Sequence, residues 1–174
     1  YSRLIAQDYD YFKISSDFAS GLHAFIKRLK QADLGKIEFI KCHITGPFTF
    51  AASIKDENGV ALLHDQVFFQ VILKALVMKA LWQIKLLREF GKKIIIFIDE
   101  PYLSAFGSAY TPLTREVLLK NLQELIEGLK GQDVLIGVHC CGNTDWSVFA
   151  EAKGVNIINF DAYSFLNNFI LYSE

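Results

Sequence analysis

The stretch KKIIIFIDEP, residues 92–101, decides the fold class of this chain. Its central residues, 94–98, are all apolar and mostly β-branched, with no polar residue at every second position. A short run of that kind is typical of a strand buried on both faces, as in a parallel sheet covered by helices. The run ends at Asp99-Glu100-Pro101, so polar side chains stand where the strand stops.

Outward from this strand, the sequence alternates between strand and helix patterns. Apolar strand patterns occupy residues 36–44, 92–99, 133–140 and 155–162. Helix patterns occupy residues 15–32, 65–90, 114–130 and 143–152, and a further one begins at residue 164. This alternation predicts an α/β protein with a parallel sheet, either an open doubly wound sheet or a closed (β/α)8 barrel.

The loops after the strands help to choose between these two architectures. No GxGxxG or Walker-type loop follows any of the strands, which argues against a nucleotide-binding fold. Four βα units are about half of a (β/α)8 barrel of roughly 250 residues. We therefore expect residues 1–174 to form a single domain that is a partial TIM-type barrel, a fragment of a larger barrel domain. The first residue is Tyr1 and not Met, which agrees with a fragment.

The composition limits the possible partners. The chain is 52% hydrophobic and contains 15 Phe, and a half barrel exposes apolar strand edges, so we expect association with a second copy or with the missing half. The formal net charge of −1 gives no electrostatic case for nucleic acid or an anionic membrane. The longest apolar stretch, residues 67–90, is interrupted by Lys74, Lys79 and Lys85, so we expect no membrane span.

The three cysteines, Cys42, Cys140 and Cys141, indicate a reducing environment. An odd number with two adjacent members is not a secreted disulfide framework, so we expect a cytoplasmic protein. His139 lies directly before the adjacent pair, in the segment GVHCCGN. In such a compartment, a cluster of His and Cys is typical of a metal or catalytic site.

The order of residues in this segment predicts which of them share a site. Side chains alternate between the two faces of a strand, so His139 and Cys141 point the same way and Cys140 points towards the helices. Histidine and cysteine are half of a tetrahedral zinc site, and Asp161, after the next strand, offers an oxygen ligand. The alternative is a buried histidine beside a small apolar cysteine at the end of a strand.

Four segments together resemble one known family. HITGPFTF (43–50), IFIDEPYL (96–103), GVHCCGN (137–143) and NIINFDAYS (156–164) occur in the order found in the catalytic barrel of cobalamin-independent methionine synthase. That barrel belongs to a wider group with uroporphyrinogen decarboxylase and the corrinoid methyltransferases. The resemblance covers about residues 37 to 168, and the His-x-Cys pair with the upstream Ile-Asp-Glu-Pro is its most specific part.

The resemblance implies a zinc-dependent methyltransferase that moves a methyl group to a thiol such as homocysteine, from a folate or a corrinoid protein. His139 and Cys141 match the first two zinc ligands, and Asp161 falls where the family has a glutamate ligand. Asp99 matches the carboxylate that holds the amino group of the substrate. The Thr45-Gly46 turn matches a substrate-binding segment. The family's last zinc cysteine lies further along the barrel.

Two departures from the family keep other functions open. Ala105 stands where the family has a second acidic residue, and residues 51–63 hold no aromatic side chain for stacking a folate. One alternative is a uroporphyrinogen decarboxylase-like lyase, although those enzymes lack the His-x-Cys pair. Another alternative is a metal-binding or degenerate barrel without catalysis.

Several other residues are expected to have structural roles. Glu100 points away from Asp99 and should be structural or a partner behind the site. Cys42 and His43 should be core residues of the first strand. The segment 143–145 should cap the following helix, and TGPFT should form a tight turn.

Overall fold

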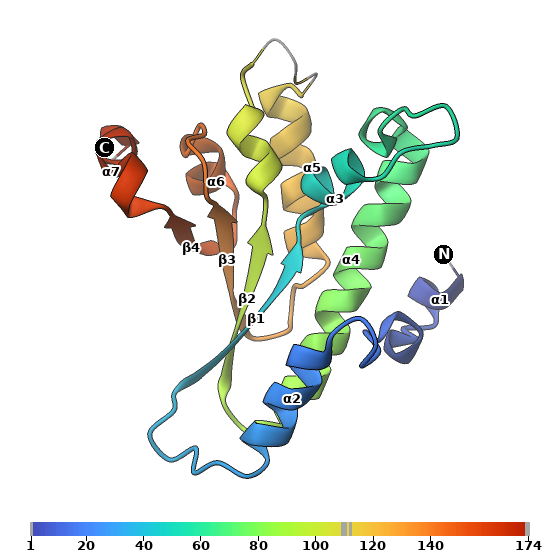
Figure 1. The fold of residues 1–174 in the computed structure, drawn as a ribbon, viewed down its shortest axis with the longest axis vertical. Coiled ribbons are helices and arrows are strands. Elements are labelled where there is room, and N and C mark those ends of the chain that lie inside the picture. The colour runs from blue at the N-terminus through green and yellow to red at the C-terminus, as the bar shows by residue number, and fades with distance from the viewer. Residues whose placement is uncertain (1, 109–110, 112, 173–174) are drawn as a thin grey trace.

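The computed structural model describes residues 2–108, 111 and 113–172. Its sheet has the helices α4 and α5 on one side (Figure 1). The strands are β1 (Phe39–Thr45), β2 (Lys93–Asp99), β3 (Val134–Cys140) and β4 (Val155–Phe160). The α-helices are α1 (Ser2–Ile5), α2 (Ser20–Leu29), α3 (Pro47–Ser53), α4 (Gln66–Leu87), α5 (Arg115–Glu127), α6 (Ser147–Glu151) and α7 (Ala162–Phe169). Short 3₁₀ turns are η1 (Tyr9–Phe12), η2 (Leu62–His64), η3 (Arg88–Phe90), η4 (Pro101–Ala105) and η5 (Ile170–Tyr172).

The four strands form one parallel sheet in the order β1-β2-β3-β4. Consecutive strands are neighbours, and a helix follows each strand. The predicted fold class is therefore confirmed as α/β with four parallel strands alternating with helices in an open sheet. A register shift at Ile136/Gly137 is the irregularity between β3 and β4.

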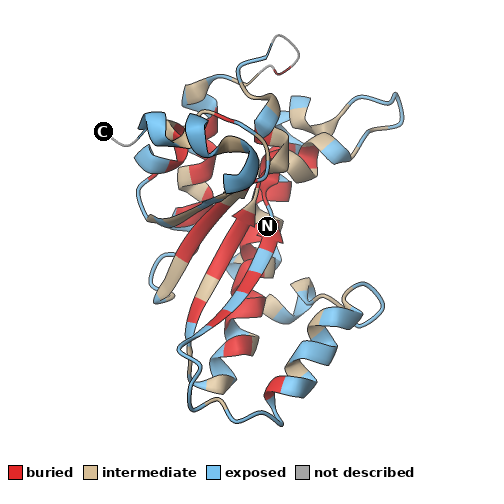
Figure 2. Ribbon diagram, turned by 60° about the vertical axis from the view of Figure 1, so that its left-hand side comes forward, coloured by how far each residue is buried: buried red, intermediate tan, exposed pale blue. Residues whose placement is uncertain are grey.

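The two faces of the sheet have different surroundings. On one face, alternate side chains of β1, β2 and β3 are buried and pack in one core with apolar side chains of α4, α5 and α6. These strand residues are Ile40, Cys42, Ile44, Ile94, Ile96, Ile98, Ile136, Val138 and Cys140. The residues between them point to the opposite face, which we call the open face; in Figure 2 the long helix α4 passes behind the strands. The sheet is covered by helices on one side.

The central helix α4 follows the predicted boundaries closely. The Asp65 carboxylate accepts hydrogen bonds from the backbone N–H groups of Val67 and Phe68, which satisfies donors that the first helical turn leaves free. Gly91 ends the segment in the left-handed conformation, with φ of 63°. Leu73, Ile84 and Leu87 are fully buried along its length.

The segment Gln66–Phe90 is, within the described residues, the one helix long and apolar enough to cross a membrane by length and composition. The lysines that interrupt it do not exclude a span on those two criteria, contrary to the sequence argument. Because 56% of its most apolar window is buried inside the fold, the finding is weak evidence for a membrane helix. The packing is that of a core helix.

Three local predictions are wrong. The first long helix starts at Ser20, with Ala19 as its N-cap, because residues 15–19 form a turn in which the Ser15 carbonyl accepts from Phe18 and Ala19. The TGPFT segment is not only a turn, since Pro47 begins helix α3. His43 is exposed on the open face, whereas Cys42 is buried as expected.

Candidate functional site

Four polar side chains form a row across the carboxyl ends of the strands. Thr45 is in register with Asp99, Asp99 with His139, and His139 with Asn159. Residues in register on neighbouring strands project to the same face. The preceding residues of the first three strands, Ile44, Ile98 and Val138, are buried, so the row lies on the open face. We call these four residues the rim row.

His139 is oriented by a side chain that the sequence analysis missed. Its Nδ1 lies 2.6 Å from the Asn159 Oδ1. A carboxamide oxygen only accepts, so Nδ1 carries the proton in this contact and the neutral imidazole keeps a lone pair on Nε2. Histidines that bind metals are commonly held by such a contact at the other nitrogen. Asn159 could have been found from its place two residues before Asp161, near the carboxyl end of a mostly apolar strand.

The two adjacent cysteines have opposite environments, as alternation along the strand predicts. Cys140 is fully buried on the helix side of the sheet, and burial raises the pKa of its thiol to about 11. Burial also raises the pKa of the Cys42 thiol, to about 12. Cys141 is exposed at the first position beyond β3. Cys141 is therefore the accessible thiol of the three.

The third predicted ligand, Asp161, serves as a helix cap. Its Oδ1 accepts from the backbone N–H groups of Tyr163 at 3.0 Å and Ser164 at 3.3 Å, at the start of α7. Hydrogen bonds from Ser164, then from Tyr163, lower the pKa of this exposed carboxyl group. Over residues 2–108, 111 and 113–172, no three or more His, Cys, Asp or Glu side chains are placed to hold a metal ion. The structure does not bring the three predicted ligands together as such a group.

Glu100 contributes more to the site than its sequence position suggests. It is fully buried, and its carboxylate accepts from Phe48 N at 3.0 Å, Thr49 N at 2.9 Å and Thr49 Oγ1 at 2.7 Å. Burial, opposed by these hydrogen bonds and assisted by the nearby Asp99 charge, raises the pKa of Glu100 to about 7. The expected structural role is confirmed, and its partners are the first residues of α3.

The turn after β1 fits against Glu100 because residue 46 has no side chain. A Cβ atom on Gly46 would lie 2.2 Å from the Glu100 carboxyl carbon. The Gly46 N–H donates to the Asp99 carbonyl at 2.8 Å, and the Glu100 N–H donates to the His139 carbonyl at 2.8 Å. These contacts fix the ends of β1, β2 and β3 relative to one another. The rim row is thus built on a rigid base.

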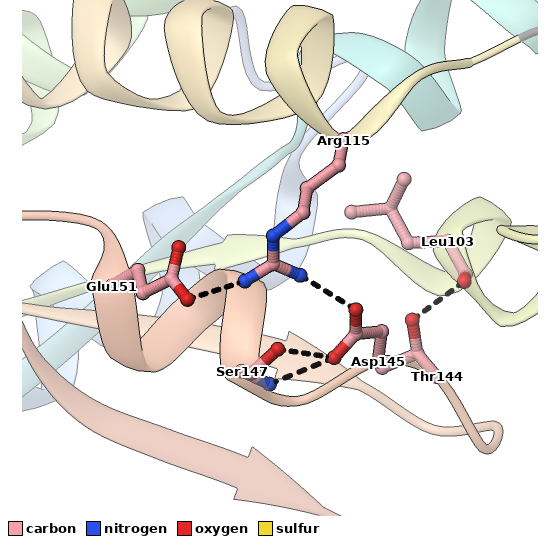
Figure 3. A network of polar contacts seen from close by, with 6 residues as sticks. All are labelled: Leu103, Arg115, Thr144, Asp145, Ser147 and Glu151. Carbon is pink, nitrogen blue, oxygen red and sulfur yellow. Dashed lines mark hydrogen bonds and ion pairs between the residues drawn. The ribbon is translucent and has the colours of Figure 1, made fainter.

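The loop after Cys141 is held by polar contacts from two other segments (Figure 3). Arg115, at the start of α5, pairs with Asp145 and Glu151, each at 2.6 Å. The Thr144 hydroxyl donates to the Leu103 carbonyl at 2.8 Å. Asp145 also accepts from the Ser147 N–H and hydroxyl. The N-cap of α6 is Trp146, whose side chain makes no capping hydrogen bond, so residues 143–145 do not supply the predicted N-cap, and Asp145 contacts the first residue of the helix from one position earlier.

Close packing against η4 also holds the loop after Cys141. A Cβ atom on Gly142 would lie 2.4 Å from the Ser104 Cβ in η4. Glycine at this position therefore lets the loop approach η4, the turn that follows β2. From the sequence, Thr144 and Asp145 are expected only as helix caps, and the ion pair between Arg115 and Asp145 joins segments 30 residues apart.

The donor set fits zinc only in part. An imidazole nitrogen and a thiol sulfur are ligands that zinc prefers, and His139 and Cys141 stand at one strand end with both groups accessible. One carboxylate oxygen of Asp161, Oδ1, is engaged in the α7 cap, and in the described residues this side chain does not form a metal-binding group with His139 and Cys141. A catalytic zinc site has three protein ligands, so the described residues do not complete one without a further donor.

Comparison with protein-family models, with curated proteins and with solved structures finds no match for this chain in any of the three.

Proposed function

We propose that this chain carries the thiol-binding part of a zinc-dependent methyltransferase of the methionine synthase type. The observation that supports the proposal is the rim row, which gathers Asp99 and His139 from neighbouring strands at the edge where parallel α/β proteins bind ligands. Cys141 lies two residues beyond His139, at the start of the loop that Thr144 and Asp145 tie to neighbouring segments. These are the residues that the family resemblance assigns to zinc and to the substrate amino group.

In this proposal each residue has a separate task. Asp99 binds the ammonium group of an amino-acid thiol, because a half-buried carboxylate and an ammonium offset each other's loss of solvation. Asn159 holds the His139 ring through Nδ1 and leaves Nε2 free to act as a ligand. Zinc, when bound, would keep the substrate sulfur as a thiolate at neutral pH. Thr45 and Gly46 shape the substrate side of the rim.

A methyl-transfer assay tests this function directly. The chain is incubated with zinc, homocysteine and either methylcobalamin or methyltetrahydrofolate, and the S-methylated product is measured by mass spectrometry. The methyl group replaces the thiol proton, so product and demethylated donor should appear in equal amounts. Absence of methylated thiol with both donors, together with no zinc-dependent binding of homocysteine, would contradict the proposal.

Asp99→Asn separates substrate binding from general damage. The variant should raise KM for homocysteine at least tenfold and leave KM unchanged for a thiol without an amino group, such as mercaptopropionate. Asp17→Asn, at an exposed site in the turn before α2, is the matched control and should behave as wild type. An equal rise in KM for both thiols would show that Asp99 does not bind the amino group.

A second candidate is a barrel that binds no catalytic metal. The observation that favours it is that Asp161 caps α7 and that no three-residue ligand group occurs in the described part of the chain. This candidate predicts neither zinc binding nor methyl transfer. Zinc titration of the wild type and of the His139→Ala and Cys141→Ser variants separates the two candidates.

A further inference from the structure

A cavity of about 440 Å³ lies between α4 and α5, on the side of the sheet that the helices cover. Sites for small organic molecules usually measure roughly 300 to 1,000 Å³, so this cavity is large enough for one. Its lining comes from α3, η2, α4, α5 and Leu113, and it contains no residue of the rim row. The cavity is therefore a separate feature from the candidate zinc site.

One part of the cavity lining is apolar and aromatic. Phe48 of α3 and Phe69 of α4 are buried, with their ring centroids 5.1 Å apart and their planes tilted by 44°. Leu63 and Leu113 are half-buried and also line the cavity. Aromatic rings favour offset-stacked or edge-to-face contact with other flat rings. This part of the cavity suits a planar ring.

The other part of the lining is a connected group of polar side chains. The Gln70 Nε2 donates to the Asn121 Oδ1 at 3.0 Å and to the Glu124 Oε2 at 3.3 Å. The Asn121 Nδ2 donates to the Val117 carbonyl at 2.8 Å, and the Glu124 Oε1 pairs with the Lys74 Nζ at 2.6 Å. Burial tends to raise the pKa of Glu124, but the hydrogen bond and charge of Lys74, with the hydrogen bond from Gln70, outweigh it and lower that pKa. Glu124 is therefore ionised at neutral pH.

The ionised Glu124 fixes the orientation of both amide groups. A carboxylate only accepts hydrogen bonds, so the nitrogen of the Gln70 amide, and not its oxygen, faces Glu124. The atom that accepts from Gln70 is then the Asn121 oxygen, which leaves the Asn121 nitrogen facing the Val117 carbonyl. Within the described residues, nothing donates to the Gln70 Oε1, and the second N–H of the Asn121 Nδ2 has no acceptor. The network therefore leaves one acceptor and one donor unused.

The unused acceptor and donor belong to neighbouring groups that are shielded from solvent. They are part of the two carboxamide groups that the hydrogen bond between Gln70 and Asn121 joins, and both residues line the cavity. Asn121 is only 7% exposed, and Gln70 is half-buried. Partly satisfied polar groups in such surroundings cost free energy, which a ligand with matching groups recovers. The matching groups are an N–H for Gln70 and a C=O for Asn121.

We propose that this cavity binds a planar ring compound with a lactam edge, in which a ring N–H stands next to a ring C=O. The N–H donates to the Gln70 Oε1, the C=O accepts from the Asn121 Nδ2, and the ring packs against the aromatic part of the lining. The ligand needs no net charge, because Glu124 is already paired with Lys74 and Lys120 is exposed to solvent. This site is additional to the proposed function and does not depend on it.

Isothermal titration calorimetry with carbostyril, a flat bicyclic lactam, tests the proposal on this chain without added zinc. We expect a Kd below about 1 mM. N-methylcarbostyril keeps the ring and the C=O but cannot donate to Gln70, so it should bind at least tenfold more weakly. Gln70→Leu should weaken the binding of carbostyril at least tenfold and remove the difference between the two compounds. Gln31→Leu, the same change at an exposed position outside the cavity, should bind both compounds as the wild type does.

Three results with these proteins would overturn the proposal. They are no binding of carbostyril at millimolar concentrations, equal affinity for the two compounds, and a Gln70→Leu variant that binds like the wild type. Lys120→Gln should leave the affinity unchanged, and a tenfold loss there would also overturn recognition by the two amides. The comparison of the two compounds uses the wild type alone, so it stays decisive if circular dichroism shows that a variant does not fold. Methyl transfer is not measured in this test, so its failure leaves the proposed function unaffected.

Discussion

The two faces of the sheet are formed by the same strands but differ in burial and in the kinds of side chain that they carry. On the covered face, Ile94, Ile96 and Ile98 pack against the helices and are buried. On the open face, the residues between them run from Lys93 to Asp99, and the rim row occupies its carboxyl edge. The comparison teaches that one strand can carry stability on one face and the candidate chemistry on the other.

The largest expected effect is a difference in the free energy of unfolding between substitutions on the two faces of β2. Ile96→Ala should lower the free energy of unfolding by about 2 to 5 kcal/mol, because it leaves a cavity in a fully buried core. Ile95→Ala, one residue away on the open face, should cost about 1 kcal/mol in the single chain. Urea denaturation at low protein concentration measures both. Equal costs would show that the open face is packed like the core.

The second effect concerns Glu100 and pH. Folding raises its pKa from the ordinary 4.5 to about 7, so the neutral form favours the folded state. Its contribution is complete below about pH 4.5 and is lost as the pH rises through 7. The loss should amount to about 3 kcal/mol at most over this window.

Glu100→Gln provides the control for this pH dependence. The variant cannot ionise, so its free energy of unfolding should stay flat between pH 4.5 and 7 while that of the wild type falls. Asp161 and Asp56 have lowered pKa values and act in the opposite direction at lower pH, outside this window. Parallel profiles for wild type and variant would contradict the assignment to Glu100.

A smaller effect compares two glycines. Gly46→Ala drives a Cβ into the buried Glu100 side chain, which is held by three hydrogen bonds, and should cost about 1 to 3 kcal/mol. Gly137→Ala places a Cβ 2.6 Å from the outer atoms of the Phe97 ring, which is buried but covered on the open face by the flexible Lys41 side chain, so the ring has a direction in which to move. We expect the cost at residue 137 to be smaller. Thermal melts of the two variants check the order, and a reversed order would be evidence against an open face.

The smallest effect belongs to the ion pairs that hold the loop after Cys141. Arg115→Ala should cost about 1 kcal/mol or less, because both of its partners are partly exposed to solvent. The cost should shrink further in 1 M salt, where surface charges are screened. Lys130→Ala, which removes a more exposed pair with Glu127, should be close to neutral. A loss above 2 kcal/mol at Arg115 would mean that the loop is a main element of stability.

The sequence predicts the sheet well because its evidence is local. The apolar run at 94–98 and the alternation around Cys140 both depend on a few neighbouring residues, and both predictions are confirmed. Capping also follows from local chemistry, as Asp65 at α4 shows. Helix α3 was not predicted, because Thr-Gly-Pro is typical both of a turn and of the start of a helix.

The site is only partly predictable because its contacts join distant segments. Glu100 meets Phe48 and Thr49 some 50 residues away, and Arg115 meets Asp145 across 30 residues. Neither contact corresponds to a recognisable pattern of residues in the sequence. Asp161 illustrates the opposite problem, since one carboxylate after a strand suits both a metal ligand and a helix cap. His139 and Cys141 as zinc ligands stay predictions.

The most direct test of the account is zinc binding by competition titration on the wild type and three variants. We predict that His139→Ala and Cys141→Ser each lower the affinity for zinc at least a hundredfold. Cys140→Ser, next to Cys141 but on the helix side of β3, should keep the affinity of the wild type. An affinity that is the same in all four proteins, or absent in all four, would contradict a zinc site at the rim row.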